Sequence, residues 1–300
     1  MKPMGMKSIG MNSTGIRSVG VKTIGRSQWW LHALLLLAAF LFAAPLLWML
    51  STAFKAPADI ISGLGTARWW PHPATLENFR NVLGKTEEFP IWRWTGNSLL
   101  ISVAVTLLVL VVDSLAAYSY ARLRWPGRDK VFGVLVATML VPGQVLLIPM
   151  YLLIRNLGWF DTYWALIVPA GASAFGVFLL RQFFLTIPAE LEEAARLDGC
   201  GPLAIFWHVI LPLSKSALAT LGIFTFMATW NAFEGPLIFT DSIEMRTLPI
   251  GITIFQGRYN TEYGPMMAAA ALAAIPVTIA FLLLQKQIIK GISLTGLAGR

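Results

Sequence analysis

The pattern nearest to a reactive site in this sequence is Gly84-Lys85-Thr86, which has the residues that end a phosphate-binding loop. Such a loop also needs a glycine separated from the Gly-Lys pair by four residues, because backbone amides must wrap around the phosphates. Phe79 occupies that position. The chain is therefore predicted to bind no nucleotide and to hydrolyse no ATP.

Other patterns of catalytic or metal-ligating residues are also missing. The sequence has neither a His-Glu-x-x-His pair for zinc nor a Gly-x-Ser-x-Gly turn for a nucleophilic serine. Its three histidines, His32, His72 and His208, are scattered along the chain, and the single Cys200 cannot form an internal disulfide. We expect no metal site, no bound cofactor and no enzymatic activity in this chain.

A polar segment, residues 186–213, lies between two long apolar runs. Thr186-Ile187-Pro188 can begin a helix there, because proline is tolerated in the first turn. Glu190, Glu192 and Glu193 would then lie near the positive N-terminal end of that helix, where carboxylates are favoured. The segment is therefore predicted to be structured rather than a simple loop.

Glycine and proline divide this polar segment into two predicted short helices. Gly199 and Gly201-Pro202 are predicted to end the first helix. The second begins at Pro202 and is predicted to end at Leu211-Pro212. Ala194 and Ala195 give the first helix a shallow surface that another backbone can approach closely. One interpretation is a docking surface for a partner protein, and the other is an ordinary amphipathic connector at the membrane interface.

The elements that hold this segment are predicted from composition. The chain has 300 residues, is 56% hydrophobic and 13% charged, and has a mean hydropathy of +0.67. Soluble domains are closer to a quarter charged, so these values indicate an all-α polytopic membrane protein, whose helices satisfy their own backbone groups in lipid. Since each span needs about 20 apolar residues, the length accommodates six transmembrane helices. The apolar runs are residues 31–53, 97–120, 131–154, 163–183, 217–239 and 265–284.

The distribution of positive charge predicts the orientation. The formal net charge is +8, and most of the 23 lysine and arginine residues lie in the termini and in the loops after the second and fourth runs. By the positive-inside rule, both termini are predicted to be cytoplasmic. Residues 54–96 then form a long external loop, and residues 186–213 are cytoplasmic. The charge is attributed to membrane topology rather than to nucleic-acid binding.

Residues 1–28 differ in composition from the six-span domain predicted over residues 29–300. A glycine recurs at every fifth position from Gly5 to Gly25, with serine, threonine and basic residues between. This composition predicts a basic, disordered cytoplasmic tail. The alternative is a tail that rests on anionic lipid.

Prolines within or near the spans are predicted to kink helices rather than end them. Neighbouring helices in a bundle can satisfy the carbonyl groups that each proline leaves without a donor. These residues are Pro45, Pro142, Pro149, Pro169, Pro236 and Pro276.

Polar side chains inside the spans are candidate contacts for a transported solute, because polar groups are costly to place in lipid. Asp113 lies in the second run, and Asn231 and Glu234, three residues apart in the fifth, are expected to share a helix face. Trp230 would add an aromatic surface of the kind that sugars stack on. The alternative is that these groups form interhelical hydrogen bonds that hold the bundle together.

The polar segment also resembles the EAA signature of ABC-importer permeases: Glu-Ala-Ala, three residues, Gly, nine residues, Ile, one residue, Leu-Pro. The matching residues are Glu193, Ala194, Ala195, Gly199, Leu211 and Pro212, with Val209 in place of the isoleucine. Further stretches are similar to the carbohydrate-uptake, maltose-type branch, in the form of its second permease subunit. They are residues 75–79, 97–99, 116–118, 142–144, 148–151, 181–184, 230–231, 248–251 and 285–291.

This resemblance implies an assembly and a mechanism. Two similar permease subunits would form the pore, two cytoplasmic subunits would bind ATP and magnesium, and an external solute-binding protein would deliver a sugar or oligosaccharide. The helix around Glu193 and Asp198 would dock on an ATP-binding subunit as a coupling helix, with Gly199 as its hinge. The chain itself would bind no cofactor and would be a multi-pass protein of the bacterial inner membrane, surrounded by lipid.

Two alternatives remain open. The solute of such an importer can be glycerol phosphate or another small polar molecule, although a phosphate calls for a cationic pocket and no arginine or lysine lies in the middle of a span. An ion-coupled secondary transporter would instead favour internal repeats and paired charges within the membrane. The sequence has no convincing repeat between its halves, and co-purification with an ATPase would separate the two classes.

Overall fold

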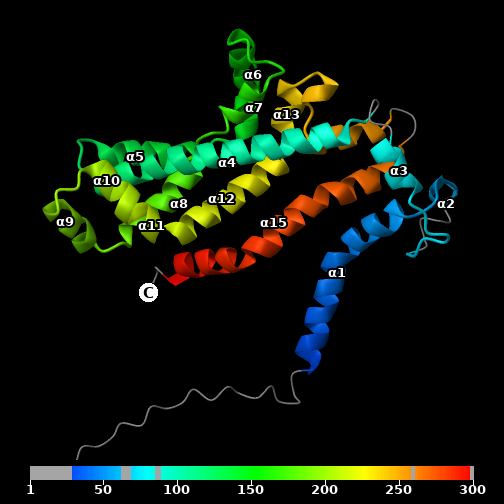
Figure 1. Cartoon of the computed structure of the whole chain (residues 1–300), viewed down its shortest axis with the longest axis horizontal. Helices are drawn as coiled ribbons and strands as arrows, with labels where there is room; N and C mark the ends of the chain where they lie inside the picture. Colours follow the sequence, from blue (N-terminus) through cyan, green and yellow to red (C-terminus); the bar gives the residue numbers. More distant parts are fainter. Residues whose placement is uncertain (1–28, 62–68, 85–88, 258–260, 298–300) are drawn as a thin grey trace, which may run out of the picture. The chain divides into compact units, whose positions relative to one another are not determined.

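The structure, a computed structural model, describes residues 29–61, 69–84, 89–257 and 261–297, with side chains through residue 282 except at residue 280. The predicted tail at residues 1–28 and the Lys85-Thr86 pair lie outside them. The described residues are helical and contain no β-strand (Figure 1). The longer helices are α1 (Trp29–Ala53), α3 (Glu77–Gly84), α4 (Ile91–Arg122), α5 (Arg128–Thr138), α6 (Leu147–Asn156), α8 (Ala174–Leu185), α9 (Ala189–Leu197), α12 (Lys215–Trp230) and α15 (Tyr263–Leu297).

Shorter helical segments connect these helices. They are α2 (Pro57–Ile61), η3 (Gly143–Leu146), α7 (Tyr163–Ile167), α10 (Pro202–Ile205), η4 (Phe206–Ile210), α11 (Leu211–Leu213), α13 (Glu234–Phe239), η5 (Ile243–Met245), α14 (Leu248–Ile252) and η6 (Thr253–Phe255). The chain divides into two compact units, residues 1–47 and residues 48–300. Apart from α1, the helices described below belong to the second unit.

Two described helices, α1 and α4, are long and apolar enough to cross a membrane, and the total reaches five if each of three bent helix pairs forms one span. The bends measure 92° between α5 and η3–α6, 78° between α8 and α9, and 80° between α10–α11 and α12. The described residues thus have the predicted all-helical architecture, with helices of the length and apolar composition of membrane spans. The count of six spans and the cytoplasmic placement of both termini stay predictions.

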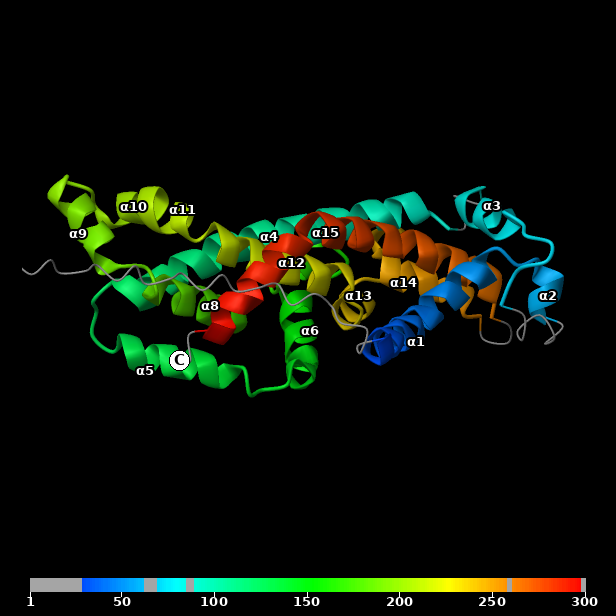
Figure 2. The same cartoon turned by 90° about the horizontal axis from the view of Figure 1, so that it is seen from below.

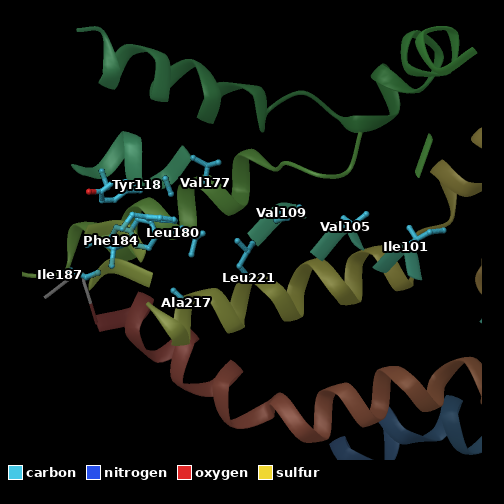
Figure 3. Packing of buried hydrophobic residues seen from close by; sticks show 14 of the residues in the cluster. Ile101, Val105, Val109, Tyr118, Val177, Leu180, Phe184, Ile187, Ala217 and Leu221 are labelled. Atoms are coloured by element: carbon cyan, nitrogen blue, oxygen red, sulfur yellow. The ribbon is translucent and has the colours of Figure 1, made fainter. Parts of the chain in front are cut away.

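The core of the second unit is built around α4, which packs against α8 and α12, while α12 also packs against α15 (Figures 1 and 2). Ile101, Val105 and Val109 repeat every four residues along α4, so their side chains share one helix face. That face meets Leu221 of α12, and Leu180 of α8 packs in the same cluster (Figure 3). The α4 residues outside this face are largely exposed apolar side chains, as expected of a helix in contact with lipid.

The prediction that six prolines kink helices rather than end them is wrong at Pro142 and Pro169, whereas the other four lie inside helices. Pro45 lies inside α1 and Pro276 inside α15, so neither ends its helix. In contrast, α5 ends at Thr138 before Pro142, and α7 ends at Ile167 before Pro169. A proline disfavours helical geometry in the residue that precedes it, and the break before Pro142 coincides with the 92° bend between α5 and η3–α6.

Candidate functional site

The segment predicted to carry a coupling helix folds as a short helix, a glycine turn and a second helical stretch (Figure 2). The first helix, α9, begins directly after Pro188, whose ψ of 134° is outside the helical region. In both views α9 and α3 lie at opposite ends of α4 (Figures 1 and 2). The coupling segment and α3, which belongs to the predicted external loop, are therefore separated by the length of α4.

Gly199 ends α9, as predicted. Its φ of +86° is in the left-handed region, which a residue with a Cβ adopts at a cost. The turn is closed by hydrogen bonds from the Gly199 amide to the Arg196 carbonyl, 3.0 Å, and from the Cys200 amide to the Ala195 carbonyl, 2.9 Å. Since a Cβ at Gly199 would meet no atom within 4 Å, the requirement for glycine is one of backbone conformation rather than of space.

The prediction that Leu211-Pro212 ends the second helix is wrong. Helical structure continues from Pro202 to Leu213, and the change of direction comes at Ser214. The turn before Pro212, residues Phe206–Ile210, is a wider π-helix. Proline removes a donor and crowds the carbonyl four residues earlier, and a π turn accommodates both effects without ending the helix. Leu211 packs against the main core, whereas Pro212 is exposed.

The two faces of α9 differ sharply. Glu192 is buried, and its Oε1 lies 3.0 Å from Nε of Arg122 at the end of α4. Glu193 and Ala194 are exposed, and Leu197 is 90% exposed. One face of α9 is therefore anchored to α4 through Glu192, and the other leaves the apolar side chain of Leu197 exposed.

Sequence reasoning treated Glu192 only as one of three carboxylates near a helix N-terminus and did not single out Arg122. The available signal was an arginine that ends a long apolar run beside an acidic helix. This signal did not identify Glu192 as the partner of Arg122, because the two residues are 70 positions apart and are brought together only by the packing of α4 against α8.

A cavity of about 720 Å³ opens between α4, α6, α7, α12 and α13. Its lining is mostly apolar and includes the aromatic residues Phe175 and Phe224 and the hydroxyl residues Thr225 and Thr229 of α12. None of the residues that line it is charged. Oγ1 of Thr247 is buried without a hydrogen-bond partner among the described residues.

The cavity's threonines were missed by sequence reasoning, although a signal existed. Thr225 and Thr229 are four residues apart and therefore lie on one face of α12, together with Leu221, which lines the same cavity. Threonine is common in membrane helices, where its hydroxyl usually bonds to the carbonyl one turn earlier, so spacing alone did not distinguish a lining residue.

Asp113 lies in the middle of α4 and is fully buried. Its carboxylate accepts hydrogen bonds from the amide of Ser173, 3.0 Å, and from the hydroxyl of Ser173, 2.9 Å. Ser173 precedes α8 and lines the cavity, whereas Asp113 does not. These contacts are those of an interhelical link, and a role of Asp113 in solute passage stays a prediction.

The expectation that Asn231 and Glu234 share a helix face is wrong, because α12 ends at Trp230 and α13 begins at Glu234. The Asn231 side chain donates to the Met227 carbonyl, 2.8 Å, and so competes with the continuing helix. Glu234 is exposed, with its Oε2 3.4 Å from the side-chain nitrogen of Gln144.

Trp230 is buried in a second core cluster, where its ring stacks on Phe226 at a centroid distance of 5.9 Å. The side chains of Trp230, Asn231 and Glu234 do not line the cavity, although their neighbours Ala232 and Gly235 do. The break between α12 and α13 was not predicted from the sequence. A contact between these three side chains and solute stays a prediction.

Asp161, in the turn between α6 and α7, holds the end of α13. Its carboxylate accepts hydrogen bonds from the amides of Asp241, 2.9 Å, and Ser242, 3.2 Å. Burial raises the pKa of Asp161, but these hydrogen bonds outweigh it and hold the pKa below its ordinary value. The carboxylate therefore anchors the backbone that follows α13, next to Phe239, which lines the cavity.

Comparison with known proteins places these features in a family. Residues 115–294 match the family described as "Binding-protein-dependent transport system inner membrane component". The chain is 33% identical over 261 residues to the arabinooligosaccharides transport system permease protein AraQ of Halalkalibacterium halodurans, covering 87% of this chain and 93% of that protein. It is 36% identical over 227 residues to the sn-glycerol-3-phosphate transport system permease protein UgpE of Escherichia coli, covering 74% and 81%.

The fold is also found in a solved structure. A chain in the crystal structure of a bacterial ABC transporter that imports the acidic polysaccharide alginate superposes with a TM-score of 0.77 at 24% identity, covering 88% of this chain and 98% of that one. The family match includes α9 and Gly199, and the relatives are transport permeases rather than enzymes. The chain therefore belongs to the family of inner membrane components of binding-protein-dependent transport systems.

Proposed function

We propose that this chain is one permease subunit of an ATP-driven importer in the bacterial inner membrane. Six spans with both termini in the cytoplasm would be formed by α1, α4, α5 with α6, α7 with α8, α12 with α13, and α15. Its partners would be a second, homologous permease subunit, two ATP-binding subunits and an external solute-binding protein. ATP and magnesium would be held by the ATP-binding subunits, and this chain would bind no cofactor.

The observation that carries this proposal is the pair of opposed faces on α9. The buried face, through Glu192, fixes the helix to the membrane-spanning bundle. The exposed face offers Glu193, Ala194 and Leu197 to a groove on an ATP-binding subunit. Closure of two such subunits on binding ATP would then displace α9. The displacement would move the spans, because the contacts of α9 would differ between the two states of the transporter.

For the solute we favour a neutral sugar or oligosaccharide. The cavity presents aromatic rings and hydroxyl groups, which suit sugar faces and sugar hydroxyls, and none of its lining residues is charged. Glycerol phosphate is the second candidate, because UgpE is a glycerol-3-phosphate permease by name and is 36% identical. An anionic phosphate would lack a cationic partner among the cavity residues of this chain.

The test is solute uptake by proteoliposomes that contain the complete complex with its binding protein. We expect uptake of arabino-oligosaccharide to require ATP in the compartment that holds the ATP-binding subunits, and to persist when ionophores remove ion gradients. Uptake driven by an ion gradient without ATP would overturn the importer proposal. Uptake of sn-glycerol 3-phosphate but of no sugar would overturn the choice of solute while leaving the importer proposal intact.

A further inference from the structure

The end of α4 and the first turn of α9 are joined by one buried ion pair. Arg122, the last residue of α4, has 11% of its side chain exposed, and Glu192 has 4%. Their Nε and Oε1 atoms are 3.0 Å apart, although the N–H is not aimed along that line, so the contact is an ion pair without a hydrogen bond. A pair this well removed from water is screened far less than a surface salt bridge.

The Arg122 guanidinium also binds the backbone that leads into α9. It donates hydrogen bonds to the carbonyls of Phe184, near the end of α8, and of Ile187, two residues before α9 begins. One planar guanidinium thus contacts α8, the connector and α9 at once. Arginine suits this role because its five donors are fixed in a rigid fork, so relative movement of these three elements breaks contacts instead of stretching them.

A second arginine braces the same end of α4. Arg181 of α8 donates through Nε to the Tyr120 carbonyl, 3.2 Å, and its guanidinium carbon lies 4.1 Å from the ring centroid of Phe132 in α5. Tyr118 of α4 also packs on Phe206 of the second helical stretch at a centroid distance of 5.2 Å. The last turn of α4 is therefore held on several sides, and α9 is attached to that rigid point through Glu192.

We propose that Arg122 and Glu192 are positioning residues that transmit the displacement of α9 to α4 during transport. This inference rests on the proposed function, in which α9 is driven by ATP-binding subunits. The α4 face that contacts the cavity, at Ile101, Val105 and Val109, belongs to the same continuous helix as Arg122. The Arg122–Glu192 pair and the unbroken helix α4 therefore form a direct route by which a force applied to α9 reaches the cavity wall.

The test uses the complete complex in proteoliposomes and measures solute molecules taken up per ATP hydrolysed. The variant Arg122→Gln/Glu192→Gln removes both charges together, so that neither is left buried without a partner. Arg124→Gln and Glu190→Gln are matched controls, because both residues are exposed. Arg124 lies two positions after Arg122, just beyond the end of α4, and Glu190 lies two positions before Glu192 in α9. Assembly and melting temperature are measured for every variant.

We expect the double variant to assemble and hydrolyse ATP while its uptake per ATP falls roughly fivefold or more, the lower end of a typical coupling effect. The controls keep the wild-type ratio. A pair that serves only the fold would lower assembly and both activities together without changing the ratio. An assembled double variant with the wild-type ratio would overturn the proposal.

Glu192→Asp provides a second test, because it keeps the charge but shortens the side chain by one carbon–carbon bond, about 1.5 Å. We expect it to assemble with a reduced uptake per ATP, and a wild-type ratio would count against the proposal. Failure of both variants to assemble would overturn it in favour of a purely structural pair. Absence of ATP-dependent uptake in the wild-type complex would instead refute the proposed function itself.

Discussion

The carboxylate of Asp113 in α4 accepts two hydrogen bonds from Ser173, one from its amide at 3.0 Å and one from its hydroxyl at 2.9 Å. The same hydroxyl accepts a hydrogen bond from the Gly176 amide, 2.8 Å, and so caps the N-terminus of α8. A Cβ at Gly176 would overlap the Asp113 carboxylate. At the break between α7 and α8, the Asp113 carboxylate thus provides the hydrogen-bond acceptor for the Ser173 amide.

Replacing Asp113 tests whether it is a link between helices. Asp113→Ala leaves the Ser173 amide without its buried acceptor, which costs about 1–3 kcal/mol. We expect a clear fall in the melting temperature of the purified complex, and a smaller fall for Asp113→Asn, which retains one acceptor oxygen. Unchanged stability of Asp113→Ala together with altered solute preference would favour a role in the solute pathway instead.

Gly251 is required for close packing. A Cβ there would overlap the indole ring of Trp94, which is fully buried and donates through Nε1 to the Ile243 carbonyl, 2.8 Å. Gly251→Ala is expected to destabilise the protein by about 1–3 kcal/mol, the range for overpacking a core. Thermal unfolding of the purified complex measures the change.

Gly133→Ala is the control for this substitution, since Gly133 lies inside α5 and a Cβ there meets no atom within 4 Å. Alanine should stabilise that helix by about 0.5–1 kcal/mol. Equal changes in melting temperature for Gly251→Ala and Gly133→Ala would show that packing against Trp94 does not determine the change in stability.

Gly199→Val tests the turn that ends α9. Valine at a φ of +86° is strained by about 1–2 kcal/mol, so the turn between α9 and α10 should shift and solute uptake should fall more than ATP hydrolysis. Gly201→Val is the matched control, because Gly201 has φ −74° and ψ 168°, an extended conformation that valine favours. Normal uptake per ATP in Gly199→Val would contradict this role for the turn.

The hydrogen bonds to Asp161 predict a dependence on pH. Its pKa is lowered in the folded protein, so its stabilising contribution is full above the unfolded pKa of about 3.9 and is lost as the pH falls through the folded pKa. We expect the difference in melting temperature between wild type and Asp161→Asn to be constant from about pH 8 to 5 and to shrink below about pH 4. A difference that stays constant down to pH 3 would mean that ionisation of Asp161 does not matter.

Local features of the fold followed well from the sequence. Hydropathy located α1 and α4, and the glycine at position 199 correctly ended α9, because both depend on residues close together in the chain. The path through Leu211-Pro212 was mispredicted, since a π turn is an alternative to a break that propensity does not reveal. The breaks near Pro142 and Pro169 likewise depend on how neighbouring helices satisfy freed backbone groups.

The site was less predictable than the fold. Two contacts join residues that are 60 or more positions apart in the sequence: Arg122 with Glu192, and Asp113 with Ser173. Their pairing is created by the packing of α4 against α8, which no spacing rule contains. The cavity is lined by small, aromatic and hydroxyl residues that are ordinary in membrane helices, so only their convergence in space distinguishes them.

Cross-linking from α9 tests the central claim, that this helix docks on an ATP-binding subunit. A photoreactive residue is placed at Leu197, which is 90% exposed, and in a control at Leu140, which is 85% exposed on the turn after α5. In the assembled complex, the account predicts an adduct with the ATP-binding subunit from position 197 and none from position 140. An assembled, transport-competent complex in which position 197 gives no such adduct would contradict it.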